Sequence, residues 1–301
     1  MLLQNSRILF VPFLLCLCFA NPEKAALAQD AAKEKDQSGS AVAPTLPFYP
    51  VDLCVAEDGT VYVVDVNLHG VWRWKEGKLD VLFEGSPKFR TPLNAPRCIA
   101  IDKDGSVLVG DSATREVYRL KEDAAPEPIT GGKIGIPMDL AVSEDGTIYV
   151  ADLESRRLFR IPPDFNSEAD SVEEVAFINP RGVTVDQSGE VWVVSQDPRQ
   201  LQKVSSEGKS ESVISKRTFR FPHQVAVDGE GVAYVSDGYG KAIWKVTGID
   251  AAEKIVEGQP LDNPVGVTWA ADTLWIVDPR VRKVFRLADG NELEEVFELK
   301  R

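Results

Sequence analysis

The sequence predicts an all-β protein made of six copies of one unit, and three observations support this prediction. First, proline recurs every 41 to 46 residues, at positions 50, 96, 137, 180, 222 and 264. Second, each proline precedes a pair of short apolar segments, joined in four copies by an Asp-Gly or Ser-Gly turn typical of a β-hairpin. Third, two further short segments complete each copy. Because one four-stranded sheet leaves both faces uncovered and six sheets around an axis bury them, we predict a six-bladed β-propeller.

The four strands of a unit can be assigned in order from the first copy. After Pro50, a strand is expected at 53–56 (LCVA), a turn at Glu57-Asp58-Gly59, and a second strand at 61–65 (VYVVD). A third strand pairs a basic residue with apolar ones (VWRW, 71–74), and a fourth follows at 79–83 (LDVLF). The same order repeats along the chain. The blades are therefore expected near 50–85, 96–132, 137–178, 180–215, 222–258 and 264–299.

Two segments precede the predicted propeller, which spans 48–301. Residues 1–28 have the layout of an export signal, with an apolar run from Ile8 to Ala20 and small residues at Ala26 and Ala28. This run is too short to span about 30 Å of hydrocarbon as a helix, so we expect a cleaved signal and no stable membrane span, with a retained anchor as the alternative. Residues 29–47 lack apolar periodicity and are expected to form a flexible linker. The mature protein is thus expected in a periplasm or outside the cell.

Charge and cysteine content narrow the class of protein. The 301 residues include 34 Lys and Arg against 47 Asp and Glu, a net charge of −13. This balance argues against nucleic acid as the main partner and favours a soluble monomer. Two cysteines remain after signal removal, Cys54 and Cys98. The repeat alignment gives them the same parity in neighbouring blades, so a sheet separates them and we expect buried free thiols.

An acidic residue ends the second strand in five of the six units. Aspartate accepts backbone N–H groups in tight turns, and a residue that recurs in every repeat is typical of a recurring structural solution. We therefore interpret these residues as structural rather than catalytic or metal-binding. They are Asp65, Asp111, Asp152, Asp237 and Asp278, with Ser195 in the sixth place.

The two faces of the predicted ring differ in charge. The hairpin turns between first and second strands share one face, called the lower face here, and most of their charged residues are acidic. The upper face receives the segment before each first strand and the loop after each second strand, and it carries many basic residues. A rim of one sign attracts ligands of the opposite sign. Scattered solubilising charge is the alternative interpretation.

The residue after each proline is expected nearest the channel on the upper face. These six residues are Val51, Arg97, Met138, Arg181, His223 and Val265. Asp52 and Asp139 lie one step further along the strand, and Tyr239 lies beside Lys241 in a loop of the fifth unit. Arginine offers a planar fork that fits carboxylate or phosphate, and tyrosine adds an aromatic wall. The set predicts a pocket for an anionic ligand, unless the arginines pair with Asp52 and Asp139 and plug the channel.

The units resemble NHL repeats, a propeller family with the pattern Pro-x-Gly-apolar-Ala-Val-Asp, then Asp-Gly, then Tyr-Val-Ala-Asp. Segments 181–186 (RGVTVD) and 138–152 (MDLAVSEDGTIYVAD) carry the resemblance. It covers about five-sixths of the chain. The resemblance implies the fold and leaves the function open, because propellers host many unrelated activities.

Three segments resemble motifs of the peptidyl-α-hydroxyglycine α-amidating lyases, which are also NHL propellers. They are 65–69 (DVNLH), 236–239 (SDGY) and Pro222-His223. The resemblance implies Tyr239 as a catalytic base and His223 as a zinc ligand. That family uses three Pro-His histidines, however, and this chain has only two histidines, His69 and His223. A catalytic zinc usually has three protein ligands, so the motif is incomplete.

The predicted architecture is also similar to the gluconolactonase family, whose propellers hold one divalent ion in the channel. The ligands of that family include an Asp and an Asn directly after the proline, where Met138 and Arg181 stand here. Asp52 and Asp139 are displaced by one residue, and such a shift is expected to turn a strand side chain to the other face. We therefore assign no calcium, zinc or other cofactor.

The sequence favours an exported NHL-type propeller that binds a small anionic molecule, an acidic peptide or an acidic glycan at the upper channel mouth. The residues expected to contact it are Arg97, Arg181, His223, Tyr239, Asp52, Asp139, Met138 and Lys241. A metal-dependent lactonase or an amidating lyase in the same cavity is the alternative, so catalysis stays open, with Tyr239 and His223 as its candidates. A third hypothesis is a protein-interaction scaffold, for which Phe89, Phe219 and Phe221 are candidate exposed aromatics on the upper face, with packing under its own blade as the alternative for Phe221.

Overall fold

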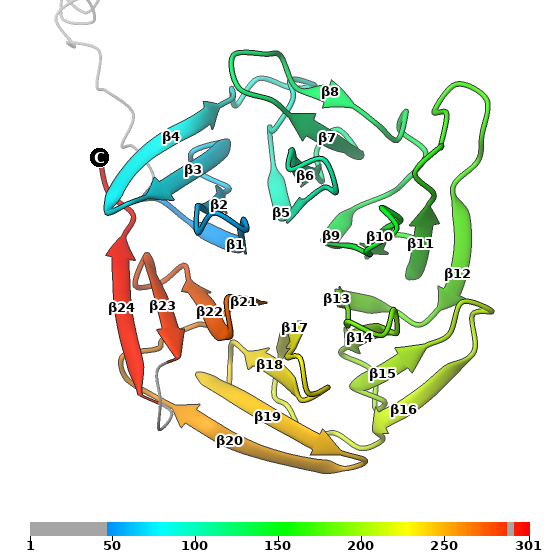
Figure 1. Cartoon of the computed structure of the whole chain (residues 1–301), viewed down its shortest axis with the longest axis vertical. Helices are drawn as coiled ribbons and strands as arrows, with labels where there is room; N and C mark the ends of the chain where they lie inside the picture. Colours follow the sequence, from blue (N-terminus) through cyan, green and yellow to red (C-terminus); the bar gives the residue numbers. More distant parts are fainter. Residues whose placement is uncertain (1–46, 288–291) are drawn as a thin grey trace, which may run out of the picture. The chain divides into compact units, whose positions relative to one another are not determined.

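The computed structural model describes residues 47–287 and 292–301, which form six sheets around a central axis (Figure 1). Each sheet has four antiparallel strands in chain order, with the first strand innermost and the fourth outermost. The predicted six-bladed β-propeller is confirmed. The expected export signal and all but the last residue of the expected linker lie outside the described residues. Nowhere in the described ranges is there a helix with the length and apolarity needed to cross a membrane.

Blades 1 to 3 occupy the first half of the ring. Blade 1 consists of β1 (Pro50–Val55), β2 (Val61–Asp65), β3 (Gly70–Lys75) and β4 (Lys78–Glu84). Blade 2 consists of β5 (Pro96–Ile101), β6 (Val107–Asp111), β7 (Glu116–Leu120) and β8 (Glu127–Pro128). Blade 3 consists of β9 (Pro137–Val142), β10 (Ile148–Asp152), β11 (Arg157–Ile161) and β12 (Glu173–Phe177).

Blades 4 to 6 complete the ring. Blade 4 consists of β13 (Pro180–Val185), β14 (Val191–Ser195), β15 (Leu201–Val204) and β16 (Ser210–Ile214). Blade 5 consists of β17 (Pro222–Val227), β18 (Ala233–Asp237), β19 (Ala242–Gly248) and β20 (Ala251–Glu257). Blade 6 consists of β21 (Gly266–Ala270), β22 (Thr273–Asp278), β23 (Lys283–Leu287) and β24 (Leu293–Glu298).

The core is divided into six apolar clusters, one between each pair of neighbouring blades. The second strands are buried along nearly their whole length because a blade packs on each of their faces, which explains their almost continuous apolar sequences. The cluster that closes the ring joins blade 1 and blade 6 through Leu53, Val63, Trp275 and Val277. Cys54 and Cys98 are buried free thiols in this core, as the repeat alignment predicts.

The ring closes without a shared strand among the described residues, because every sheet draws its four strands from one continuous segment. The two ends of the described chain meet on blade 1. Phe48 packs edge-on against Trp72 with ring centroids 4.8 Å apart. Arg301 forms an ion pair with Glu84 at 2.6 Å.

The aspartate at the end of each second strand binds backbone N–H groups of the loops beside it. Asp111 accepts hydrogen bonds from the N–H groups of Asn94, Ala95 and Ala113 and from the Thr114 hydroxyl, all at 2.9 to 3.0 Å. The carboxylates of Asp65, Asp152, Asp237 and Asp278 also accept loop N–H groups. In blade 4 the Ser195 hydroxyl accepts the N–H of Asp197 at 3.2 Å. The aspartate at the end of a second strand thus connects the loop that precedes its blade to the loop that follows the strand.

Replacing Asp111 by alanine should lower the free energy of unfolding by about 3 kcal/mol or more, since several partly buried donors lose their acceptor together. Urea unfolding followed by tryptophan fluorescence measures the change. Glu57→Ala, which removes an exposed carboxylate from a hairpin turn, is the control and should shift the free energy by less than about 0.5 kcal/mol. Equal effects of the two substitutions would contradict the structural role of Asp111.

Candidate functional site

The innermost strands are distorted where they meet the channel. The register with the second strand shifts at the residue after the proline in five blades, for example between Pro50 and Asp52 in blade 1 and between Pro180 and Gly182 in blade 4. A β-bulge of this kind leaves the extra residue unpaired and changes the direction of the side chains that follow. The expectation that Asp52 turns away from the channel is therefore wrong.

The upper part of the channel is a cavity of about 150 Å³. All six residues that follow a proline line it, together with residues from the loops before β1 and β21. The lining residues are Tyr49, Val51, Arg97, Met138, Arg181, His223, Gln224, Asn263 and Val265. The propeller thus brings together three sequence-predicted polar residues, Arg97, Arg181 and His223, from blades 2, 4 and 5.

Neither guanidinium in this cavity has a carboxylate partner in the ranges 47–287 and 292–301. Arg97 donates only a 3.3 Å hydrogen bond from Nε to the Ser112 hydroxyl. Arg181 lies over the ring of Phe221, 4.9 Å from its centroid, and its buried Nε has no hydrogen-bond partner. Burial and the nearby positive charge of Arg97 lower the pKa of Arg181. Two like charges therefore share a small space without compensation, which favours the entry of an anion.

His223 adds a titratable group to the same cavity. Its ring packs against Phe221 with centroids 5.0 Å apart. Burial, followed by the positive charge of Arg181, lowers the pKa of His223 to about 4. The imidazole is therefore neutral at neutral pH, and it can accept or donate one hydrogen bond without adding charge.

A layer of three polar side chains forms the floor beneath this cavity. Asp52 of β1, Asp139 of β9 and Gln224 of β17 occupy the same place in alternate blades, two residues after the proline. Each side chain accepts the N–H of the innermost strand of the following blade. The acceptor-to-donor pairs are Asp52 with Ile99 at 2.9 Å, Asp139 with Val183 at 2.8 Å, and Gln224 with Val267 at 2.9 Å.

The intervening blades carry small residues at this position, which makes room for the layer. They are Cys98, Gly182 and Gly266. A Cβ at Gly182 would lie 2.6 Å from the carbonyl oxygen of His223, and one at Gly266 would lie 2.9 Å from the Cα of Asp52. The ring is thus pseudo-threefold at its axis, with large polar and small residues alternating around it.

The floor does not neutralise the arginines above it. Both oxygens of each carboxylate are held by backbone N–H groups, and Gln224 also donates to Asp139 at 2.9 Å. No ion pair joins Arg97 or Arg181 to Asp52 or Asp139 in the part of the chain that the structure describes. The alternative in which these pairs plug the channel therefore has no support in the contacts. Asp52 and Asp139 face the lower part of the channel, where they line a separate cavity of about 210 Å³.

Burial of two carboxyl groups side by side changes their titration. Burial raises the pKa of Asp52 to about 7. Burial, followed by repulsion from Asp52, raises the pKa of Asp139 well above its usual range. Both carboxyl groups therefore keep a proton to higher pH than an exposed aspartate does. No group of three or more His, Cys, Asp or Glu among the described residues is arranged to hold a metal ion.

Besides Asp52 and Asp139, two further residues that the sequence predicted to contact the ligand, Tyr239 and Lys241, lie outside the upper cavity. Tyr239 has 61% of its surface exposed and packs against Phe221 with ring centroids 4.5 Å apart and the ring planes tilted by 33°. It lines a separate hollow of about 540 Å³ on the upper face with Arg217, Thr218, Phe219 and Arg220. Lys241 forms an ion pair with Asp262, so its charge is already compensated.

Sequence reasoning missed Tyr49, Asn263 and Gln224, and it named Phe221 only as a candidate exposed aromatic, not as a neighbour of Arg181 and His223. Tyr49, Phe221 and Asn263 each stand directly before the proline that begins a blade, and the loop leading into the blade brings them to the site. This position before the proline is visible in the sequence. Gln224 aligns with Asp52 and Asp139 in the repeat, so the alignment already contained its position. What the sequence did not contain was the bulge that turns this position toward the axis.

The comparisons with solved structures support the fold. The chain is similar to virginiamycin B lyase from Staphylococcus aureus, with 15% identity, a TM-score of 0.60, and 84% of this chain and 85% of that chain covered. A gluconolactonase from Xanthomonas campestris gives 17% identity and a TM-score of 0.64 over 78% of this chain and 84% of that chain. A nidogen/laminin complex gives 15% identity and a TM-score of 0.64 over 84% and 92%.

No protein-family model and no curated protein sequence matches the chain. The similar structures are six-bladed β-propellers. At these levels of identity they establish the architecture alone, and they carry no assignment of activity.

The carboxyl pair should make the stability of the protein fall as pH rises from 6.5 to 8. The unfolded chain, with carboxyl pKa values near 4, has released protons that the folded protein still holds on Asp139 and, up to about pH 7, on Asp52. Stability therefore drops by up to about 1.4 kcal/mol per pH unit for each proton still held, and the share of Asp52 levels off once pH exceeds its pKa. The low pKa of His223 acts in the opposite sense, but only below about pH 6.5, where the unfolded histidine takes up a proton.

Urea unfolding of the wild-type protein and of Asp139→Asn at several pH values from 6.5 to 8 tests this dependence. The slope, and not the absolute stability, should become flatter in the variant. Asp104→Asn, on the lower face, is the matched control because the pKa of Asp104 is lowered and the group stays ionised throughout the range. Unchanged slopes in Asp139→Asn would rule out a buried proton at this position.

Proposed function

We propose that this propeller is a binding module that takes an anionic group into the upper channel cavity. One observation carries the proposal: Arg97 and Arg181 converge there without a carboxylate partner in the described ranges, and the carboxylates nearest to them, Asp52 and Asp139, are held by backbone N–H groups of the floor. Arginine forks bind carboxylate and phosphate groups with paired hydrogen bonds. An anion would compensate both charges at once.

The size of the cavity supports a ligand of which only the charged end is buried. A volume of about 150 Å³ corresponds to roughly five water molecules, which suits a carboxylate or phosphate group with a few attached atoms. The rest of such a ligand would lie over the upper face. There, Tyr239 offers an aromatic surface, and Arg217 and Arg220 line the neighbouring hollow. These features favour an acidic peptide or an acidic glycan over a free inorganic anion.

The repeat sequence supports an NHL-type propeller, and the apolar run from Ile8 to Ala20 supports export, so we propose an exported protein of this type. A metal-dependent lactonase is the alternative that the gluconolactonase neighbours favour. The donors in the upper cavity do not fit a divalent cation, because two guanidinium groups stand where oxygen ligands would be needed. The scaffold hypothesis keeps Phe89, which is 80% exposed, whereas Phe219 is buried.

Calorimetry with glucuronate, phosphate and a dipeptide with a free carboxylate tests the proposal. At least one of these anions should bind, and Arg97→Ala or Arg181→Ala should each raise its Kd by about tenfold or more, since each removes a charge-assisted hydrogen bond. Arg181→Lys should give an intermediate loss because it keeps the charge but not the fork. Arg199→Ala removes an exposed arginine outside the cavity and should leave Kd within about twofold. Binding that survives both cavity substitutions would overturn the proposed site.

The pKa of His223 provides an independent readout. In the free protein its ring should titrate near pH 4, and a bound anion should raise this pKa by offsetting the charge of Arg181. Proton NMR can follow the ring directly because the chain has only two histidines, His69 and His223. His69→Gln assigns the signal. An identical titration of His223 with and without the anion would place the anion elsewhere.

A further inference from the structure

The regular repeat is interrupted at one place on the outside of the ring. The fourth strand of blade 2, β8, has two residues, whereas the described fourth strands of the other blades have five to seven. In the neighbouring blade 3, the third and fourth strands are joined by the long segment 162–172. The two irregular segments approach each other closely: a Cβ at Gly131 would lie 3.1 Å from the carbonyl oxygen of Ser167.

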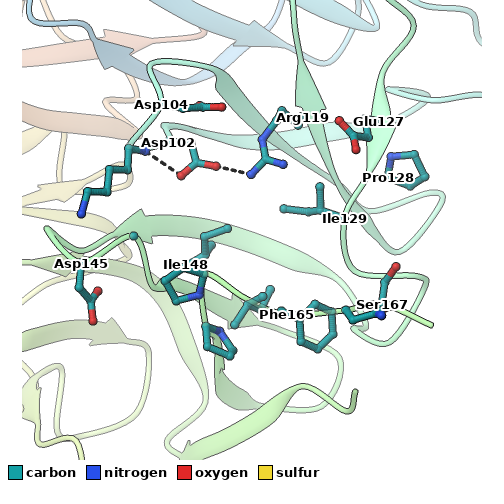
Figure 2. Close-up of a pocket in the computed structure, with 16 residues that line it drawn as sticks. Asp102, Asp104, Arg119, Glu127, Pro128, Ile129, Asp145, Ile148, Phe165 and Ser167 are labelled. Carbon is teal, nitrogen blue, oxygen red and sulfur yellow. Dashed lines mark hydrogen bonds and ion pairs between the residues drawn. The ribbon is translucent and has the colours of Figure 1, made fainter. Parts of the chain in front are cut away.

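Between these irregular segments lies a pocket of about 670 Å³, which opens near the lower-face turns of blades 2 and 3 (Figure 2). Its volume is within the range of sites that bind ligands or peptide side chains. It is far larger than the upper channel cavity, and the two share no lining residue. The pocket is therefore a separate candidate site.

The inner wall of the pocket is apolar. Ile129 follows the short strand β8, Ile148 and Ile161 belong to β10 and β11, and Phe165 comes from the long segment of blade 3. Figure 2 shows Ile148 and Phe165 on one side of the space and Asp102 and Arg119 on the other. Phe165 and Ile129 are only partly buried against the apolar cluster of blades 2 and 3. An apolar side chain from outside could complete this cluster.

The rim of the pocket is acidic. Its charged lining residues are Asp102, Lys103, Asp104, Arg119, Glu127 and Asp145, which leaves a net charge of −2. Asp102 and Arg119 form an ion pair with each other. Asp104 and Asp145 have no ion-pair partner in the described ranges, and hydrogen bonds from Ser106 and Ser143 lower the pKa of each carboxyl, so both are ionised at neutral pH. Glu127 pairs with Lys121, and Lys103 has no ion-pair partner among the described residues, so the unpaired rim charges are two carboxylates against one ammonium and their sum is negative.

One donor in the lining is also unsatisfied. The Nε of Arg119 is buried and has no hydrogen-bond partner, although the guanidinium pairs with Asp102. A buried N–H of this kind calls for an acceptor such as a carbonyl oxygen. The apolar wall, the unpaired carboxylates and the free N–H donor together call for a ligand that carries an apolar group, a positive charge and a hydrogen-bond acceptor.

We propose that this pocket binds a short segment of a partner protein in which an apolar side chain stands next to lysine or arginine. The apolar side chain would pack on Ile148 and Phe165. The basic side chain would meet Asp104 or Asp145, and a carbonyl of the segment would accept the hydrogen bond from Arg119. The proposal does not depend on the anion site, because that site lies on the opposite face and uses other residues.

Three blocked, fluorescein-labelled peptides test the proposal on the whole propeller: Ala-Lys-Leu-Lys-Ala, Ala-Glu-Leu-Glu-Ala and Ala-Lys-Ser-Lys-Ala. Fluorescence anisotropy should detect binding of the first peptide only. Equal binding of the serine peptide would show attraction to charge without apolar recognition and would overturn the proposal, as would the absence of binding by the leucine peptide.

Two matched double substitutions locate the binding. Asp104→Asn with Asp145→Asn removes the two unpaired rim charges, and it should raise the Kd of the leucine peptide by about tenfold. Glu57→Gln with Asp58→Asn removes the same two charges from the lower-face turn of blade 1 and should change Kd by less than about twofold. Equal losses would mean diffuse attraction to the acidic face and would overturn the site. Phe165→Ala, which removes part of the apolar wall, should also raise the Kd of the leucine peptide. If this variant has a lower melting temperature than the wild-type protein, the comparison of the two double substitutions is the deciding test.

Discussion

Each innermost strand of the ring has one edge without a neighbouring strand, and its backbone N–H groups must find acceptors inside the channel. Three side chains meet this constraint by reaching into the next blade: Asp52, Asp139 and Gln224 accept the N–H groups of Ile99, Val183 and Val267. The character of the whole site follows from this arrangement. Carboxylates that hold backbone donors in the floor are not available to the arginines above, so the upper cavity keeps its positive charge.

The same constraint explains the packing at the axis. Three large polar side chains fit into one layer only because Cys98, Gly182 and Gly266 stand between them. The layer separates the channel into an upper cavity with basic groups and a lower cavity with the carboxyl pair. One layer of hydrogen-bonded side chains thus separates two chemically different cavities.

The fold could be predicted from the sequence because its signals are local and repeated six times. A proline, an apolar strand and a turn each reflect the conformation of a few residues, and their period reveals the blade. The positions of Arg97, Arg181 and His223 followed from the same period. The roles of Asp52 and Asp139 did not, because a β-bulge reverses the alternation on which the prediction relied. Tyr239 and Lys241 were also placed too close to the cavity, since Tyr239 packs against Phe221 at the start of its own blade and Lys241 pairs with Asp262 in the loop before blade 6.

The way the ring closes makes one interface between blades different from the other five. Five of the six interfaces between blades are crossed by the polypeptide itself. Within residues 47–287 and 292–301, the interface between blades 6 and 1 is held by side chains such as Leu53 and Trp275, with Phe48 and Arg301 at its outer rim. Blades 6 and 1 are therefore the one pair of neighbouring blades that could separate without stretching a connecting segment of the described chain. Separation of blades 6 and 1 would therefore need only the loss of side-chain packing, whereas separation of any other pair of neighbours also strains the chain segment that joins them.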